Sequence, residues 1–358
     1  MPSKFIARIE AWFNDLQFKI VNFDIKPAKP IFNDLLDQAQ LSISDGNFIL
    51  AEKLLQKALI MSRENYDVLI AVSNFYSSLG MLSKSARIIK KAIKLRPNSS
   101  ELYSALGDIY YYQGKYKASA KVMQQALALS PDQVQLEDLI NSRLGRKVPR
   151  ASLCYITSLF DEYADSFESD LIEVLEYKVH VTMANYLSQK KLNIPQPLES
   201  VLDLGCGTGL LGQALVSKLK INKLIGVDLS TKMLEYSRTK GIYQELYHLD
   251  LVDYLQQADA NMQDLIVSAD VMVYIGDLDP IFEQCYRCLK PSAYFCFSVE
   301  SMFYGDYKLM SYTRYKHSLR YIKSLYKKYH FSKMYSWTID LRKESGNMVK
   351  GYLVLLQK

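Results

Sequence analysis

The sequence has few of the features that mark secreted, membrane-spanning or disulfide-stabilised proteins. It contains only five cysteines among 358 residues, which is too few for a disulfide framework and typical of a reducing compartment. No run approaches the ~18 consecutive apolar residues of a membrane span. Glu10 and Asp15 interrupt the apolar residues near the start, so no signal-peptide core lies there. We therefore expect a cytoplasmic protein without a membrane span.

The sequence also lacks a large excess of charge of one sign. Its 44 Lys and Arg residues against 38 Asp and Glu residues give a net charge of +6, which does not by itself imply a nucleic-acid partner. The excess lies in 308–358, where twelve Lys or Arg residues stand against Asp340 and Glu344. Interleaved tyrosines leave nucleic acid open as an alternative, but several stand three apart, as on one helix face. We favour an acidic small molecule or an acyl carrier over RNA.

The first half of the chain repeats with a period of 34 residues. Each copy holds two amphipathic stretches around a glycine turn, and proline ends the later copies. The columns that keep this period are Gly46, Gly80, Gly114, Ala58, Ala92, Ala126, Phe48, Leu82, Tyr116, Pro97 and Pro131. The pattern resembles the tetratricopeptide repeat (TPR), most closely in ELYSALGDIYYYQGKYKASAKVMQQALALSP.

This resemblance divides the first half of the chain. We place three repeats at 32–133, of which the first is degenerate, with Ala39 at a glycine position. Residues 1–31 contain an amphipathic helix that we expect to pack on the first repeat, a membrane-surface or partner helix being the alternative. Residues 134–150 are expected to form a capping helix and a basic linker. Repeats of this kind imply a groove for a protein partner; bracing of the second half or self-association are the alternatives.

Strands and helices alternate in the second half, which we predict to be one domain at 151–358. The strands VLDLG, KLIGVDLS, LYHLDL, DLIVSADV and SAYFCFSVE are separated by helical segments, as in a parallel, doubly wound sheet. MYSWTIDLR and VKGYLVLL are joined by KESGNM, which favours an antiparallel hairpin. The predicted fold class is α + α/β: a helical solenoid, then a Rossmann-like, seven-stranded sheet with a C-terminal hairpin.

The motif DLGCGTG, at 203–209, directly follows the first of these strands and precedes a helix. A ligand can bind at that strand end, and Asp228, at the end of the next strand, can accept the hydroxyls of a ribose. The spacing Gly207-x-Gly209-x-x-Gly212 also satisfies a dinucleotide fingerprint, so the glycines alone leave both readings open. Asp203 separates them, because a carboxylate near the loop repels a pyrophosphate and suits a cationic ligand.

The segment VLDLGCGTGLLG resembles motif I of the class I S-adenosylmethionine-dependent methyltransferases. The resemblance covers 151–358 and implies S-adenosylmethionine as the cofactor. It also implies four groups of contacts: the methionine end, the ribose, the adenine and the methyl group. The implied contacts are Gly205, Cys206, Gly207 and Gly209 for the methionine end, and Asp228 and Leu229 for the ribose. For the adenine they are Asp250 and Leu251, and for the methyl group Ser268, Ala269 and Asp270.

A narrower resemblance, to bacterial methyltransferases with N-terminal TPRs, begins at FDEYADSFESDLIEVLEYK. It implies that Tyr163 covers the amino-acid end of the cofactor. It also singles out RYKHS, in the region that commonly forms the substrate lid. There we name His317 as a candidate base, with a bracing role for the next helix as the alternative. Arg314 is a candidate ligand for a substrate carboxylate or phosphate.

No metal site is expected. Cys285-x-x-Cys288 lacks a second pair of ligands, so we interpret it as structural. The sequence thus predicts methyl transfer to a small acceptor, acidic or acyl-carried, with the repeats used for protein docking or self-association. Two alternatives remain: a protein or peptide methyltransferase whose repeats recruit the substrate, and a non-catalytic adaptor.

Overall fold

The computed structural model describes residues 32–62, 65–131, 133–310, 313–344 and 347–358. The predicted helix within 1–31 lies outside the described residues. The chain divides into two compact units, Met1–Leu144 and Gly145–Lys358. Within the described residues, no helix combines the length and the apolar character that a bilayer crossing requires.

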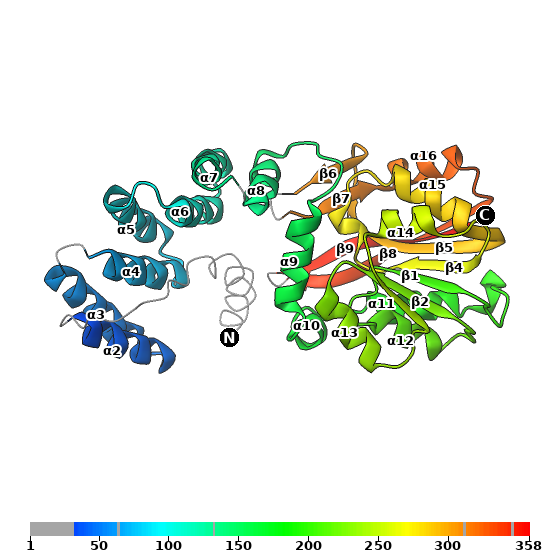
Figure 1. Cartoon of the computed structure of the whole chain (residues 1–358), viewed down its shortest axis with the longest axis horizontal. Coiled ribbons are helices and arrows are strands. Elements are labelled where there is room, and N and C mark those ends of the chain that lie inside the picture. The colour runs from blue at the N-terminus through cyan, green and yellow to red at the C-terminus, as the bar shows by residue number, and fades with distance from the viewer. Residues whose placement is uncertain (1–31, 63–64, 132, 311–312, 345–346) are drawn as a thin grey trace. The chain divides into compact units, whose positions relative to one another are not determined.

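The first unit is a series of helix pairs, as the TPR pattern predicts (Figure 1). The turn inside each pair contains Gly46, Gly80 or Gly114, whose φ angles of 70° to 74° favour glycine over any L residue. A further helix follows the third pair. The helices are α2 (Phe32–Ser44), α3 (Phe48–Met61), α4 (Tyr66–Ser78), α5 (Leu82–Leu95), α6 (Ser100–Tyr112), α7 (Tyr116–Leu129) and α8 (Val134–Leu144).

Small residues allow these helices to pack closely. Ala58, Ala92 and Ala126, which recur with the 34-residue period, are completely buried on the second helix of each pair. Gly107 serves the same purpose on α6, since a Cβ there would lie 2.6 Å from Met123 Cγ of α7. The periodic small residues of the sequence are therefore packing positions between neighbouring helices.

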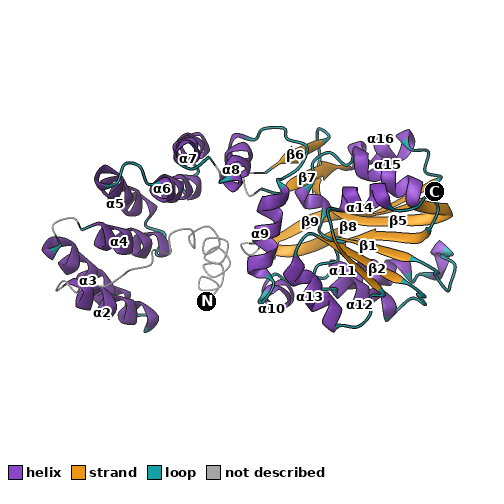
Figure 2. Ribbon diagram, viewed as in Figure 1, coloured by secondary structure: helices purple, strands orange, loops and turns teal. Residues whose placement is uncertain are grey.

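The second unit is built on one mixed sheet (Figure 2). Its first five strands are mutually parallel in the order β3-β2-β1-β4-β5, and β9 joins β5 antiparallel and pairs with β8. The strands are β1 (Val201–Leu204), β2 (Leu224–Asp228), β3 (Glu245–His248), β4 (Gln263–Ser268), β5 (Leu289–Met302), β6 (Tyr307–Leu309), β7 (Tyr315–Ser318), β8 (Lys333–Glu344) and β9 (Asn347–Gln357).

The predicted number of seven strands is too low, because the described part of the sheet has nine. The two additional strands are β6 and β7. In register, β4 ends opposite Phe297, whereas β5 continues to Met302. Beyond the end of β4, the same edge of β5 pairs with β7, beginning at Glu300. The opposite edge of β5 pairs with β9, also at Glu300. The sequence of these short strands has no clear alternation, so local pattern did not reveal them.

Helices cover both faces of the sheet. Figure 1 shows α11, α12 and α13 on one side and α14, α15 and α16 on the other. All four residues of β1 are buried, as expected for a central parallel strand with helices on both faces. The helices are α9 (Leu153–Tyr163), α10 (Phe167–Ser169), α11 (Val179–Leu187), α12 (Leu210–Val216), α13 (Thr231–Thr239), α14 (Leu251–Gln257), α15 (Asp279–Cys288) and α16 (Leu319–Lys328).

Candidate functional site

The glycine loop between β1 and α12 has three residues in left-handed conformations. Gly205, Gly207 and Gly209 have φ angles of 70°, 53° and 88°. A Cβ on Gly205 would lie 2.3 Å from Val271 Cγ2, so the loop packs directly against the segment after β4. A Cβ on Gly207 would meet nothing within 4 Å. The loop therefore exposes bare backbone to open space at its centre, where a ligand can approach.

Asp203 lies at the base of this loop and is 1% exposed. The Tyr243 hydroxyl donates a 2.7 Å hydrogen bond to its Oδ2, whereas its Oδ1 has no hydrogen-bond partner. Burial raises the pKa of the Asp203 carboxyl to about 7. The site therefore contains a buried acceptor oxygen without a donor, on a group that ionises near neutral pH.

Tyr243 accounts for two of the three glycines of the dinucleotide-like spacing, Gly209 and Gly212, and for Gly226 on β2. A Cβ on Gly212 would lie 2.3 Å from the Tyr243 hydroxyl oxygen, and a Cβ on Gly226 would lie 3.0 Å from its Cδ1. Gly209 is also close, at 3.1 Å from Cε2. The glycines make room for the ring that reaches Asp203. The sequence analysis did not identify Tyr243. The feature that could have indicated a large side chain at this place is the pair of glycines, Gly212 on α12 and Gly226 on β2.

Asp228, at the end of β2, binds the loop from the other side. Its Oδ2 accepts from the Gly207 N–H at 2.8 Å and its Oδ1 accepts from the Ser230 N–H at 2.9 Å. Burial raises the pKa of this carboxyl, and the two backbone donors oppose that shift. The structure thus brings Asp228 and the loop together. Leu229 follows half-buried, and the loop residue Cys206 is buried with its thiol pKa raised by burial.

Asp250 is the N-cap of α14 and accepts hydrogen bonds from the N–H groups of Val252 and Asp253. Arg150 also binds it, with Nη2 at 2.6 Å from Oδ2 and Nη1 at 3.2 Å from Oδ1. Burial opposes ionisation, yet Arg150 and the backbone donors hold the pKa of this carboxyl below its usual range. Both oxygens are already engaged, so an adenine contact at Asp250 and the neighbouring buried Leu251 stays a prediction.

The end of β4 contributes the next predicted group. Ser268 is buried and donates to the Leu204 carbonyl at 2.9 Å, which fixes β4 against β1. Ala269 is half-buried. Asp270 has a φ of 60°, unusual for a non-glycine residue, and its N–H donates to Ser298 Oγ at 2.8 Å. The Asp270 carboxylate lies beside Arg314, which directly precedes β7, and Arg342 of β8.

Asp270 belongs to a buried ionic cluster. Arg314 Nη2 lies 2.9 Å from Asp270 Oδ2, and Arg314 Nε lies 3.0 Å from Glu300 Oε1. Arg342 Nη2 lies 2.5 Å from Glu300 Oε1 and 2.6 Å from Glu344 Oε1. Burial opposes ionisation of Glu300, but the two guanidinium groups hold its pKa below the usual range. Arg314 directly precedes β7 and is paired with two carboxylates, so its role as a ligand for a substrate carboxylate or phosphate stays a prediction.

Aromatic side chains flank this cluster. The Arg314 guanidinium lies 5.3 Å from the ring centre of Tyr274, and Tyr274 meets Phe160 of α9 edge to face at 5.4 Å. Tyr163, also on α9, is buried against Phe167 at 5.2 Å, and burial raises its pKa well above the usual value. Helix α9 thus supplies an aromatic wall beside the end of β4.

His317 does not have the surroundings that its predicted role as a base requires. It is completely buried, with Nε2 3.1 Å from the Gly276 carbonyl oxygen, and its ring stacks with Tyr321 of α16. Burial lowers its pKa to about 4, so the ring is neutral at physiological pH. This geometry agrees with the alternative, a histidine that braces the following helix.

Cys285 and Cys288 are both buried on α15 against the sheet core, and burial raises the pKa of both thiols. Within the described residues, no group of three or more His, Cys, Asp or Glu side chains has a geometry that could hold a metal ion. The pair packs as ordinary core residues.

Comparison with known families matches three segments of the chain. The methyltransferase domain family matches residues 202–295, which include the glycine loop, Asp228, Asp250 and Asp270. Two TPR families match residues 66–99 and 100–133. The fold and the family match together identify a class I S-adenosylmethionine-dependent methyltransferase domain. This chain carries that domain after N-terminal tetratricopeptide repeats.

Curated relatives match part of the second half. The chain is 31% identical over 147 residues to malonyl-[acyl-carrier protein] O-methyltransferase of Methylovorus sp. (strain MP688), covering 39% of this chain and 47% of the relative. It is 25% identical over 129 residues to ubiquinone biosynthesis O-methyltransferase of Histophilus somni (strain 2336), covering 34% and 52%. The chain thus spans about half the length of these relatives.

Solved structures also match. Phosphoethanolamine N-methyltransferase 2 of Haemonchus contortus, in complex with phosphomonomethylethanolamine and S-adenosylhomocysteine, shares 18% identity at a TM-score of 0.40, over 49% of this chain and 52% of that one. A methyltransferase of Archaeoglobus fulgidus shares 16% identity at a TM-score of 0.39, over 50% and 93%.

Proposed function

We propose that the protein transfers a methyl group from S-adenosylmethionine to a small acceptor. One observation carries the proposal: the loop that exposes bare backbone at Gly207 follows the buried Asp203 and is hydrogen-bonded to Asp228, within the segment that matches the methyltransferase family. Carboxylates attract a ligand with ammonium and sulfonium charges and repel linked phosphates. S-adenosylmethionine supplies, when bound, an electrophilic methyl group on a sulfonium.

The residues at the site fit this cofactor. The unpartnered Asp203 Oδ1 is a buried acceptor suited to an N–H donor, and the space above Gly207 leaves the loop open to a ligand. We assign the methionine end to Gly205, Cys206, Gly207 and Gly209, with Tyr163 above it. We assign the ribose to Asp228 and Leu229, the adenine to Asp250 and Leu251, and the region of the methyl group to Ser268, Ala269 and Asp270.

The rate enhancement would come mainly from alignment and from exclusion of water. The rings of Tyr163, Phe160 and Tyr274 form an apolar wall beside Asp270, and a wall of this kind holds an acceptor in place and keeps water out. Holding two reactants in line can supply a large part of the rate of a transfer reaction. We therefore assign no proton transfer to His317.

We propose an acidic or acyl-carried acceptor. Support comes from the two guanidinium groups, Arg314 and Arg342, at the end of the sheet, and from relatives whose names include a malonyl-[acyl-carrier protein] O-methyltransferase. An acceptor carboxylate would compete with Asp270 for Arg314 Nη2, because this is the more exposed of the two ion pairs of Arg314: Asp270 is 17% exposed and Glu300 is 0% exposed. A planar guanidinium suits such an exchange between carboxylates.

The TPRs are proposed to dock a protein or to mediate self-association. If the substrate were itself a protein or peptide, substitutions on the repeats would abolish methylation of it and spare any small acceptor. If the chain were a non-catalytic adaptor, cofactor binding would occur without turnover.

A thermal-shift screen of the full chain with S-adenosylmethionine, S-adenosylhomocysteine and NAD tests the cofactor assignment first. Stabilisation by the first two compounds and not by NAD supports the proposal.

A further inference from the structure

Charge is segregated between the two helices of each repeat. The first helices, α2, α4 and α6, contain acidic residues and no Lys or Arg. The second helices, α3, α5 and α7, contain nine Lys or Arg residues against one acidic residue, Glu52. The basic residues are Lys53, Lys57, Lys84, Arg87, Lys90, Lys91, Lys94, Lys117 and Lys121.

Helix dipoles explain the positions of acidic residues on the first helices but not the positions of the basic residues on the second helices. Asp34, Asp67 and Glu101 each lie in the first turn of their helix, where a negative charge is favourable. Basic residues gain the same benefit only in a last turn. Among the second helices, only Lys94 of α5 lies in such a turn. The remaining positive charges need another explanation.

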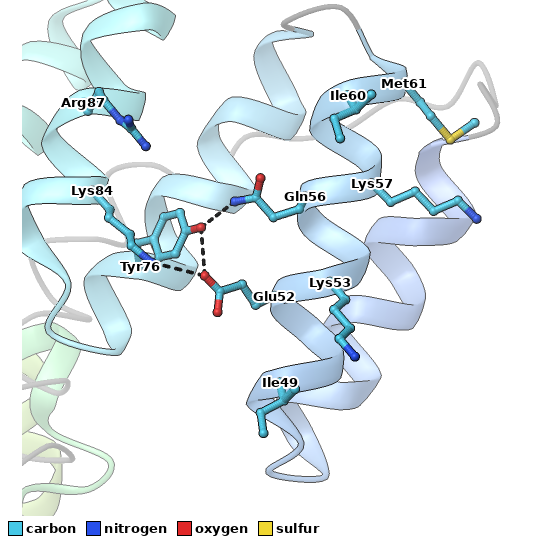
Figure 3. Close-up of a pocket in the computed structure, with 10 residues that line it drawn as sticks. All are labelled: Ile49, Glu52, Lys53, Gln56, Lys57, Ile60, Met61, Tyr76, Lys84 and Arg87. Atoms are coloured by element: carbon cyan, nitrogen blue, oxygen red, sulfur yellow. Dashed lines mark hydrogen bonds and ion pairs between the residues drawn. The ribbon is translucent and has the colours of Figure 1, made fainter.

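A hollow of about 680 Å³ opens on the basic side of the first two repeats (Figure 3). Helix α3 supplies most of its lining, with Lys84 and Arg87 from α5 and Tyr76 from α4. Ile49 and Ile60 line it although they are 74% and 79% exposed. Met61 is exposed beside them. Such exposed apolar side chains, gathered around a hollow, mark a contact surface.

The polar side chains at the floor of the hollow are hydrogen-bonded to one another. The Tyr76 hydroxyl donates to Glu52 Oε1 at 3.1 Å and accepts from Gln56 Nε2 at 2.5 Å, and Figure 3 shows both side chains pointing toward Tyr76. Lys84 Nζ lies 3.3 Å from Glu52 and above the Tyr76 ring. The one carboxylate of the second helices is thereby neutralised. Lys53, Lys57 and Arg87 form no ion pair with any described residue and remain exposed.

We propose that this basic hollow binds an acidic amphipathic helix of a partner protein. The residues that form the binding surface are Ile49, Lys53, Lys57, Ile60 and Arg87. Apolar side chains of the partner would enter the hollow beside the isoleucines, while its carboxylates would meet the surrounding cations. A concave, isoleucine-lined surface suits a helix better than a flat bilayer. Stacking of nucleic-acid bases needs an exposed ring, and Tyr76 is only 3% exposed.

The proposal goes beyond methyl transfer and does not depend on it, because binding is measured without cofactor. The probe is a fluorescein-labelled helical peptide of ~18 residues, about five turns, with leucine on one face and glutamate on the other. Fluorescence anisotropy of the full chain with this probe should show saturable binding that weakens with salt. A peptide with the leucines replaced by serine should bind at least about tenfold more weakly, which is about 1.4 kcal/mol.

Three variants locate the site. Lys53→Glu with Lys57→Glu should weaken binding about tenfold, and Ile60→Ser should weaken it several-fold without affecting folding, because this side chain is exposed. The matched control, Lys117→Glu with Lys121→Glu on α7, makes the same charge change outside the hollow and should leave affinity within about twofold. Circular dichroism checks that all variants keep their helix content.

Other outcomes would overturn the proposal. Equal losses in the hollow and control variants would mean a diffuse basic surface. Tighter binding of anionic phospholipid vesicles or of an RNA oligonucleotide than of the peptide would assign the surface to another class of ligand. Displacement of the probe by a peptide with the sequence of residues 1–31 would indicate that the chain's own N-terminal segment occupies the hollow.

Discussion

The Tyr243 hydroxyl donates a 2.7 Å hydrogen bond to Asp203 across 40 residues of sequence, through space that Gly212 and Gly226 leave open. This contact holds one oxygen of the carboxylate and leaves the other without a donor. A buried acceptor without a partner is costly in the empty protein. We interpret that cost as the consequence of a site shaped for a cationic ligand.

Asp203→Asn should stabilise the empty protein and weaken cofactor binding. A carboxyl whose pKa rises on folding, here to about 7, contributes stability at low pH that is lost as pH rises through 7. The neutral amide lacks this penalty, so the melting temperature at pH 8 should rise by about 2 °C or more, while affinity for S-adenosylmethionine falls about tenfold. Thermal melts and calorimetry measure both. Asp259→Asn, at an exposed position, is the control; a variant that binds normally would contradict the assignment.

Gly212→Ala should disturb the site through Tyr243. The added methyl would lie 2.3 Å from the Tyr243 hydroxyl, so the ring must move and its bond to Asp203 must break. We expect a loss of stability of about 1–3 kcal/mol, as for overpacking, together with weaker cofactor binding. In Tyr243→Phe the ring Cζ would still lie 2.6 Å from the methyl, so the double variant uses Tyr243→Leu, which removes both clashing atoms. Gly212→Ala should cost less stability when added to Tyr243→Leu than when made in the native chain, and urea unfolding measures this recovery. No recovery would mean that Tyr243 is not the obstacle.

Glu300→Gln should be among the most destabilising single changes in the second unit. Glu300 is fully buried and compensates both Arg314 and Arg342, and removal of one partner from such a pair costs about 3–5 kcal/mol. Urea unfolding should show that loss. Glu176→Gln, which breaks the exposed pair with Lys343, should cost far less. Equal losses of unfolding free energy in the two variants would mean that the buried cluster contributes no more to stability than the exposed ion pair does.

His317→Gln should change acid stability and leave the pH profile of methyl transfer unaltered. The depressed pKa of His317, about 4, means that its contribution to stability is present above its ordinary value and is lost as pH falls through 4. Glutamine can still donate to the Gly276 carbonyl but cannot titrate, so the variant should lose less stability than the native chain between pH 6 and 4, measured as melting temperature. A large fall in kcat with loss of one limb of the pH profile would restore the role of a base.

The sequence predicted what local pattern encodes. The 34-residue period located the helix pairs, and the alternation of strands and helices located the parallel strands and the glycine loop between β1 and α12. Long-range packing was out of reach: Tyr243 approaches the loop from beyond α13, and Arg150 reaches Asp250 across 100 residues. The edge taken by β7 depends on where β4 ends relative to β5, which no local pattern records. Residue type also could not show that His317 is buried, and burial is what lowers the pKa of this side chain.

We expect the glycine loop and its two carboxylates to bind S-adenosylmethionine. Isothermal titration calorimetry of the full chain with S-adenosylmethionine, S-adenosylhomocysteine and NAD tests it most directly, with Asp228→Ala as the site variant. We expect one site for the first two compounds, an affinity about tenfold lower in the variant, and no heat with NAD. Binding of NAD without binding of the sulfonium compound, or unchanged affinity in Asp228→Ala, would contradict it.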